Sequence, residues 1–166
     1  FWSASVNSGF SYLKSLSIDL TYIILLNDDL HISCNNLLRL VALNNGRQIS
    51  APLILDFNDT RKVVFSGKSW SNRTLSYVET YSDIYEIPDC NSVDILAGNC
   101  LAIPFNVLAG KTSLVNEFSF PHVFGDASFC IDMKNEWNLN SVVFKEVIAY
   151  DDTSDKDGKN YFIQGL

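Results

Sequence analysis

The stretch LLRLVALNNGRQISAPLIL, residues 37–55, decides how the fold is interpreted. At its centre Asn45-Gly46 separates two apolar runs. An Asn-Gly pair in this setting favours a two-residue type I′ hairpin, because both central residues take positive φ. The register of that hairpin pairs apolar residues with one another: Ala42 with Ile49, Leu40 with Ala51, and Leu38 with Leu53. We therefore expect an antiparallel β-hairpin here.

Alternation of apolar and polar residues continues outward from this stretch. In residues 16–26 every even position is apolar, as in a half-buried strand. Further short strand candidates are separated by Gly, Asn and Asp: 62–65, 101–108, 114–120, 127–133, 142–150 and 161–163. Such spacing is typical of a sandwich or a barrel. We expect a single all-β domain over residues 1–166, an antiparallel β-sandwich, with a closed β-barrel as the alternative.

Two features complicate this strand assignment. Pro52 and Pro104 fall inside expected strands, and proline removes a hydrogen bond from the ladder, so these strands should be edges or carry bulges. Residues 74–87 fit a strand or a helix, because their tyrosines recur every four residues. The Ser and Thr content of this segment favours a strand.

The composition restricts the partners. Twelve Lys and Arg against 19 Asp and Glu leave a net charge of −7, which repels phosphate backbones, so nucleic acid is not expected as a partner. No apolar run approaches the ~20 residues of a membrane-spanning helix. Gly110-Lys111-Thr112 resembles the end of a phosphate-binding loop, but Phe105 replaces the required first glycine. We expect no cofactor, and nothing in the sequence indicates the oligomeric state.

The cysteines and the first residues indicate a compartment. The chain begins with Phe1-Trp2, without an initiating Met, and contains four cysteines: Cys34, Cys90, Cys100 and Cys130. An even cysteine count in a short chain fits two disulfides in an oxidising compartment, so we expect a secreted protein or the ectodomain of a surface protein. Pairing of Cys90 with Cys100 and of Cys34 with Cys130 is favoured over the two other connectivities. Four free thiols are the alternative.

Two N-glycosylation sequons support the same compartment. They are Asn58-Asp59-Thr60 and Asn72-Arg73-Thr74. Their number is what chance gives in a chain rich in Asn, Ser and Thr, but both lie between apolar runs, where turns are expected and a glycan would stay in solvent.

Candidate catalytic residues are few. His31 and His122 lie far apart, and neither has the closely spaced ligands of a zinc site. Glu79 and Asp83 share one face of their segment among tyrosines, and glycoside hydrolysis needs only two carboxylates. The simpler interpretation is that both carboxylates face solvent, so no catalytic residue is assigned.

An acidic stretch near the C-terminus is a weak calcium candidate. Asp155 and Asp157 precede Gly158, as in half of a calcium-binding loop. The twelfth position of such a loop would be Gln164 and not the usual bidentate Glu, so we expect a solvated loop and no metal.

The aromatic residues indicate binding. They make up 13% of the chain, and Trp2, Trp70 and Trp137 lie in polar contexts that suggest exposed loops. Tryptophan in a loop can anchor a protein or a glycan. We expect a non-catalytic extracellular module that binds a protein or a carbohydrate. A small-molecule carrier barrel of the lipocalin type and a carboxylate-dependent glycan hydrolase are the alternatives.

Overall fold

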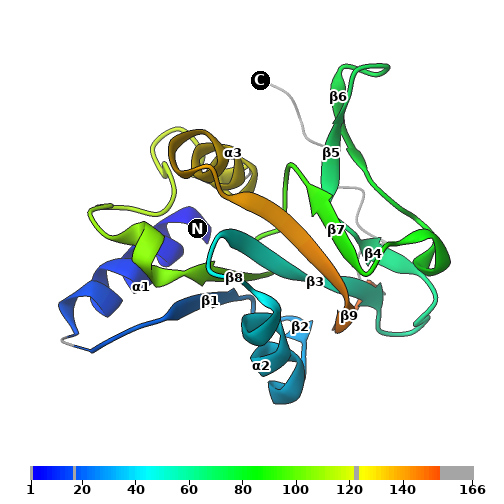
Figure 1. The fold of residues 1–166 in the computed structure, drawn as a ribbon, viewed down its shortest axis with the longest axis horizontal. Coiled ribbons are helices and arrows are strands. Elements are labelled where there is room, and N and C mark those ends of the chain that lie inside the picture. The colour runs from blue at the N-terminus through cyan, green and yellow to red at the C-terminus, as the bar shows by residue number, and fades with distance from the viewer. Residues whose placement is uncertain (1, 17, 122–123, 154–166) are drawn as a thin grey trace.

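The computed structural model describes residues 2–16, 18–121 and 124–153, and Figure 1 shows their arrangement. A seven-stranded mixed sheet contains, in spatial order, β1 (Tyr22–Leu26), β8 (Cys100–Pro104), β3 (Gln48–Asp56), β9 (Asn140–Asp151) and β2 (Leu30–His31). Two more strands join it: β4 (Val63–Phe65) pairs with β3, and β7 (Cys90–Val93) pairs with β9. A separate hairpin consists of β5 (Lys68–Ser71) and β6 (Ser76–Glu79).

Helices cover both faces of this sheet. Figure 1 shows α1 (Trp2–Ser15) and α3 (Gly125–Trp137) on one side and α2 (Cys34–Leu43) on the other. Two short 3-10 helices, η1 (Ile84–Glu86) and η2 (Phe105–Leu108), lie in the connections. None of the helices in the described ranges is long and apolar enough to cross a bilayer.

The parallel pair of β3 and β9 forms the centre of the sheet. Ser50 of β3 lies opposite Val142 of β9, and all nine residues of β3 are buried. A strand buried on both faces needs apolar cover on both sides, which the helices supply. One core contains Phe10 and Phe129, from α1 and α3, and the other contains Leu40 of α2.

The expected hairpin at Asn45-Gly46 is wrong. The residues before it form α2, whose first turn is capped by Ser33, because the Ser33 hydroxyl accepts a hydrogen bond from the backbone of Asn36. Leu38, expected to face Leu53, is 70% exposed. Gly46 does take a positive φ of 76°, but it does so in the loop that joins α2 to β3. Asn45 does not share this positive φ, so the predicted type I′ turn is wrong as well as the predicted hairpin partner.

The fold class is confirmed only in part. The protein is sheet-rich, with 34% strand and 30% helix, but the sheet is mixed and open, so the closed barrel is wrong and an all-β sandwich is not confirmed. Residues 127–133 lie in α3, because Phe129, Cys130 and Met133 recur at helical spacing towards the core. Residues 114–120 form no strand, and residues 74–87 contain β6 and η1. The expected strand at 161–163 lies outside the described residues.

The two prolines behave differently. The β3–β9 register shifts between Pro52 and Leu53, so the expected irregularity is present at Pro52, although β3 is central and not an edge. Pro104 is the last residue of β8, where the missing N–H costs little.

No two of the four cysteines are bonded in this structure, so the expected disulfides stay a prediction that this arrangement does not support. Cys90 and Cys100 lie on β7 and β8, which are separated by β9 and β3. Three strand spacings amount to about 14 Å, against the ~4.4–6.8 Å between Cα atoms that a disulfide allows. Cys130 packs in the core beneath α3, whereas Cys34 begins α2 on the opposite face of the sheet.

Candidate functional site

A cleft of about 630 Å³ lies at one end of the sheet, between the β5–β6 hairpin and α3. Its lining is mostly apolar and aromatic, with a few polar side chains: Phe65, Lys68, Tyr77, Ile95, Leu96, Ala97, Phe120, Phe124, Asp126, Ala127, Ser128 and Ile131. This volume is in the range of small-molecule sites, which cover about 300–1,000 Å³.

The topology explains why the cleft forms at this end. β8 runs antiparallel to β1 and β3, so the residues just before β8 lie beside the end of β1. Val93 at the end of β7 lies opposite Ser141 at the start of β9, so the segment 94–99 crosses the sheet. Ile95, Leu96 and Ala97 of this segment line the cleft. The same end holds the turn after β1, where the backbone N–H of Asn27 donates to the carbonyl of Asn99 at 2.9 Å.

Asp126 is the one acidic residue among the twelve that line the cleft. It lies in the first turn of α3, where carboxylates are favoured by the helix dipole. Its Oδ2 accepts the backbone N–H of Gly98 at 3.0 Å, and its Oδ1 accepts that of Ala127 at 2.8 Å. These two bonds orient the carboxylate and connect α3 to the segment before β8.

Gly98 has little room for a side chain. A Cβ at this position would lie 2.5 Å from the indole of Trp2, and Gly125 is similarly close to Ser3 and Val115. Gly98 thus allows α1 to approach the segment before β8, and Gly125 allows α1 to approach the start of α3, which carries Asp126.

The hairpin forms the opposite wall of the cleft. Backbone hydrogen bonds join Lys68 to Ile95 on the strip before β8, at 3.0 Å. Trp70 and Tyr77 pack edge to face, with ring centroids 5.2 Å apart. This contact holds the Tyr77 ring in place in the lining of the cleft.

An ion pair connects the hairpin to α3. Asp94 accepts the backbone N–H of Trp70 at 2.9 Å and the ammonium of Lys134 at 2.7 Å. The hydrogen bond from Lys134, followed by that from Trp70, lowers the pKa of Asp94. The carboxylate therefore stays charged and holds both walls of the cleft together.

Lys68 and Glu79 form a second charged pair beside the cleft. The ammonium of Lys68 lies 3.4 Å from Glu79, while Lys68 itself lines the cavity. Desolvation raises the pKa of Glu79, and Lys68 opposes that effect. The hairpin wall therefore carries the ammonium of Lys68, whose charge is balanced by Glu79 outside the lining.

The third wall is the loop that carries Phe120 and precedes α3. The hydroxyl of Ser3 donates to the carbonyl of Phe120 at 2.6 Å, which fixes this loop to α1. Phe124 has a φ of 63° where α3 begins, and its ring is largely exposed at the cleft. The exposed aromatic face is available to a ligand.

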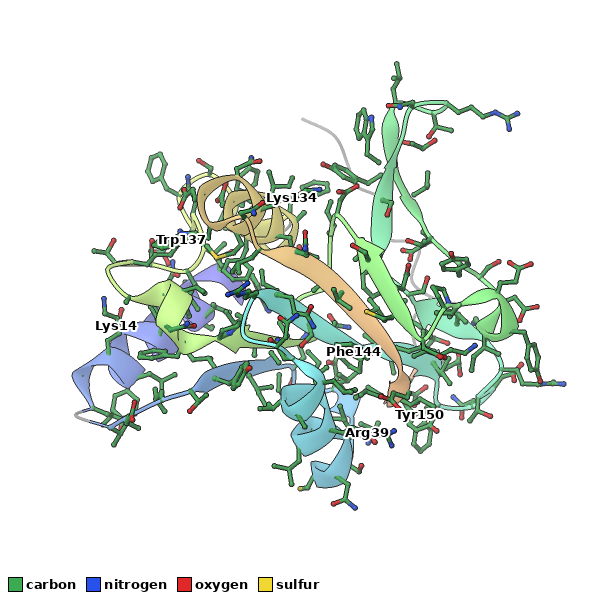
Figure 2. The ribbon with its side chains drawn as sticks, in the orientation of Figure 1. Lys14, Arg39, Lys134, Trp137, Phe144 and Tyr150 are labelled. Atoms are coloured by element: carbon green, nitrogen blue, oxygen red, sulfur yellow. The ribbon has the colours of Figure 1, made fainter. Side chains whose placement is uncertain are left out.

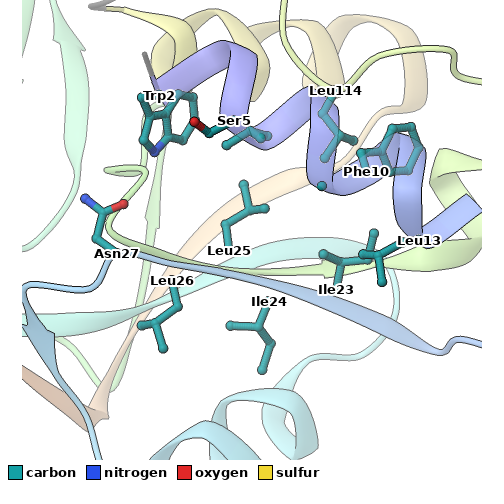
Figure 3. A pocket seen from close by; sticks show the side chains of 12 residues that line it. Trp2, Ser5, Phe10, Leu13, Ile23, Ile24, Leu25, Leu26, Asn27 and Leu114 are labelled. Carbon is teal, nitrogen blue, oxygen red and sulfur yellow. The ribbon is translucent and has the colours of Figure 1, made fainter.

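A second cavity, of about 320 Å³, lies between α1 and β1. Trp2 and Phe10 of α1 line it, and Figure 3 shows Leu25 and Ile23 on the side of β1 that faces α1. Asn27 and Ser5 are its only polar lining residues within the described part of the chain. With no charged group to orient a ligand, this cavity is the weaker candidate.

The structure does not bring the three expected tryptophans together. Trp2 packs in α1 against Gly98, Trp70 is on β5, and Trp137 ends α3 (Figure 2). None of the three is in a loop. Trp70 alone contacts the cleft, through Tyr77.

The other candidates are dispersed as well. His31 stacks on Phe57 at the end of β2, with ring centroids 4.9 Å apart. Asp83 caps η1, by accepting the backbone N–H of Tyr85, and does not face Glu79 across a cleft. In the described ranges no group of three or more His, Cys, Asp or Glu could hold a metal. His122, Asp155 and Asp157 lie outside the described residues.

Sequence reasoning missed Asp126, because residues 127–133 were interpreted as a strand. A helix beginning near Gly125 could have been recognised from the helical spacing of Phe129, Cys130 and Met133, with an acidic residue in the first turn. That Gly98, Tyr77 and Lys68 meet Asp126 is a tertiary property and leaves no local signal.

The fold is an open mixed sheet with helices on both faces, and it carries a ligand-sized cleft between the β5–β6 hairpin and α3. No protein-family model matches the chain, and no curated protein matches its sequence. The function must therefore be argued from the residues of the cleft.

Proposed function

We propose that the protein is an extracellular carbohydrate-binding protein and that the sugar occupies the cleft between the β5–β6 hairpin and α3. Sugars present apolar C–H faces and hydroxyl edges, so they suit sites that combine exposed aromatic rings with a few charged groups. Tyr77, Phe120 and Phe124 supply the rings, and Lys68 and Asp126 supply the charges.

The orientation of Asp126 is the observation that carries this proposal. An ionised carboxylate has about four lone-pair sites, and the N–H groups of Gly98 and Ala127 use two of them. The remaining sites can accept two hydroxyl groups, which is how a carboxylate binds a vicinal diol. A carboxylate fixed in this way loses little conformational entropy when the sugar binds.

The shape of the site favours a carbohydrate over a protein partner. Stable protein interfaces bury roughly 800 Å² on each partner, over broad surfaces. The cleft instead surrounds a volume suited to a small ligand and is lined by a limited set of residues.

The same carboxylate favours one catalytic function as a second candidate. Hydrolysis of a glycoside needs two carboxylates across the bond, and Asp126 is the one acidic residue lining the described cleft. A single carboxylate can act as a general base towards a bound hydroxyl. Asp126 would take the hydroxyl proton while that oxygen attacks an activated sugar donor, whose leaving group departs with the bonding electrons.

A glycan array followed by calorimetric titration tests the binding function. We expect Asp126→Asn to weaken binding of an array ligand by about 10–100-fold, because a charge-assisted hydrogen bond contributes ~1.5–3 kcal/mol. Asp19→Asn, at an exposed position, is the matched control. Likewise Tyr77→Ala should weaken binding, and Tyr12→Ala, on exposed α1 surface, should not. Equal affinities for Asp126→Asn and Asp19→Asn would refute the assignment.

Mass spectrometry separates the two candidate functions. The bound glycan is incubated with a panel of activated sugar donors, and the products are weighed. A gain of one sugar that depends on Asp126 indicates transfer, whereas an unchanged mass with retained binding indicates a binding protein only.

A further inference from the structure

The tip of the β5–β6 hairpin carries a sequon in an unusual setting. Asn72 follows β5 immediately and is exposed, as are Arg73 and Thr74. Trp70, two residues before Asn72, is 48% exposed, and its indole Nε1 donates to Asn72 Oδ1 at 3.0 Å. The side chain of the acceptor asparagine is therefore held at the N–H edge of an exposed indole ring.

This hydrogen bond determines which end of the amide is available. With Oδ1 bound to the indole, Nδ2 is the remaining polar atom of the side chain, and it has no hydrogen-bond partner among the described residues. Nδ2 is the atom to which an N-linked glycan is attached. A sugar joined there begins next to the exposed indole of Trp70, which can cover one of its apolar faces.

The sequon at Asn58 has a different environment. Nδ2 of Asn58 donates to Asp152 Oδ1 at 3.1 Å, and the backbone N–H donates to Asp56 Oδ1 at 2.8 Å. Asp56 occupies the position that Trp70 holds in the other sequon. The nearby ring of Phe57 already stacks on His31. A glycan on Asn58 would have to share Nδ2 with the hydrogen bond to Asp152 and would gain no aromatic support.

We propose that Asn72 is the N-glycosylated residue of this protein and that its first sugar rests on Trp70. The donor is a lipid-linked oligosaccharide. The bond between its anomeric carbon and the lipid pyrophosphate breaks, a new bond joins that carbon to Asn72 Nδ2, and Nδ2 loses one proton. The pyrophosphate leaves with the bonding electrons.

Site occupancy is the first test. The chain is expressed behind a cleavable secretion signal in cultured animal cells, and medium and whole lysate are both analysed, so that poor secretion does not hide the product. Enzymatic release of N-glycans in ¹⁸O water converts an occupied Asn into labelled Asp, which peptide mass spectrometry counts. We expect label at Asn72 and little at Asn58. An unlabelled Asn72, or equal label at both, overturns the proposal.

The second test concerns contact with Trp70. Releasing the glycan should lower the Tm of the wild type by about 2–4 °C and leave the Tm of Trp70→Ala unchanged. Trp137→Ala removes an equally exposed tryptophan elsewhere and should respond as the wild type does. Trp70→Phe keeps an aromatic face and should retain the response if the alanine variant does not fold. The same Tm loss in Trp70→Ala as in the wild type would show that the sugar does not rest on this ring.

Discussion

A single buried amide, that of Asn7, joins α1 to the loop that forms one wall of the cleft. Its Oδ1 accepts the backbone N–H groups of Leu114 and Val115, at 2.9 and 3.0 Å, and its Nδ2 donates to the Val115 carbonyl at 2.8 Å. Nδ2 also donates to Glu117 at 3.1 Å. Both the oxygen and the nitrogen of the Asn7 amide therefore bind this loop.

Asn7→Ala should lower the free energy of unfolding by about 2–4 kcal/mol, because it leaves buried backbone groups without partners. Urea denaturation measures this change. Asn35→Ala, at an exposed position of α2, should change the free energy of unfolding by less than about 0.5 kcal/mol. A similarly small change for Asn7→Ala would contradict the role assigned to its amide.

Asp56 at the end of β3 gives stability a pH dependence. Hydrogen bonds, that from the Thr153 hydroxyl foremost and then that from the Asn58 backbone, lower the pKa of Asp56 from 3.8 to about 2. Because the folded pKa lies below the unfolded one, this carboxylate stabilises the fold above about pH 4, and the contribution is lost as the pH falls towards 2.

Asp56→Asn should therefore be less stable than the wild type at neutral pH, and the difference should shrink between about pH 5 and pH 2. Urea midpoints at several pH values measure the difference. Asp59→Asn, whose carboxylate is mostly exposed, is the control. A difference that stays constant over this interval would show that ionisation of Asp56 is not what stabilises the fold.

At the scale of elements, the positive φ of Gly46 was predictable from the sequence, but the elements that the loop joins were not. The requirement of Gly46 for positive φ was recognised, yet an Asn-Gly turn serves a helix-to-strand loop as well as a hairpin. The side chain of Asn44 decides for the loop, since its Nδ2 donates to the Gln48 carbonyl and its Oδ1 accepts the Gly46 N–H, both at 2.9 Å. Strands β4 and β9 do coincide with predicted segments, and β9 has the longer apolar run of the two.

The reactivity of the four cysteines tests the arrangement of the elements, because two of them are buried and two are exposed. Cys100 in β8 and Cys130 in α3 are buried, and burial raises the pKa of their thiols to about 12 and about 11. Cys34 and Cys90 are exposed. A maleimide added to native protein should label Cys34 and Cys90 rapidly, and the other two only after unfolding. The labelled cysteines are identified by peptide mass spectrometry without reductant. If all four cysteines resist labelling even after unfolding, they form two disulfides, and this result would contradict the fold.

For the whole molecule, an all-β fold was expected because short apolar runs alternate with turn residues along the chain. That pattern does not show what covers each strand, and only the tertiary fold shows that β3 is buried along its whole length between helices. The site was less predictable. Trp70 was identified from its polar surroundings, whereas Asp126 depends on a helix start and a contact with Gly98, 28 residues away in sequence.

Chemical-shift mapping of the ¹⁵N-labelled protein, titrated with a glycan selected on the array, tests the central claim most directly. The backbone N–H groups of Gly98 and Ala127 bind the Asp126 carboxylate, so their resonances report any ligand that contacts it. We predict that the largest shifts are at Gly98, Ala127 and Ser128, and that a glycan concentration that produces them in Asp19→Asn produces little shift in Asp126→Asn, where binding is about 10–100-fold weaker. Shifts confined to the cavity between α1 and β1, or shifts that persist in Asp126→Asn, would contradict the assignment of the cleft as the carbohydrate site.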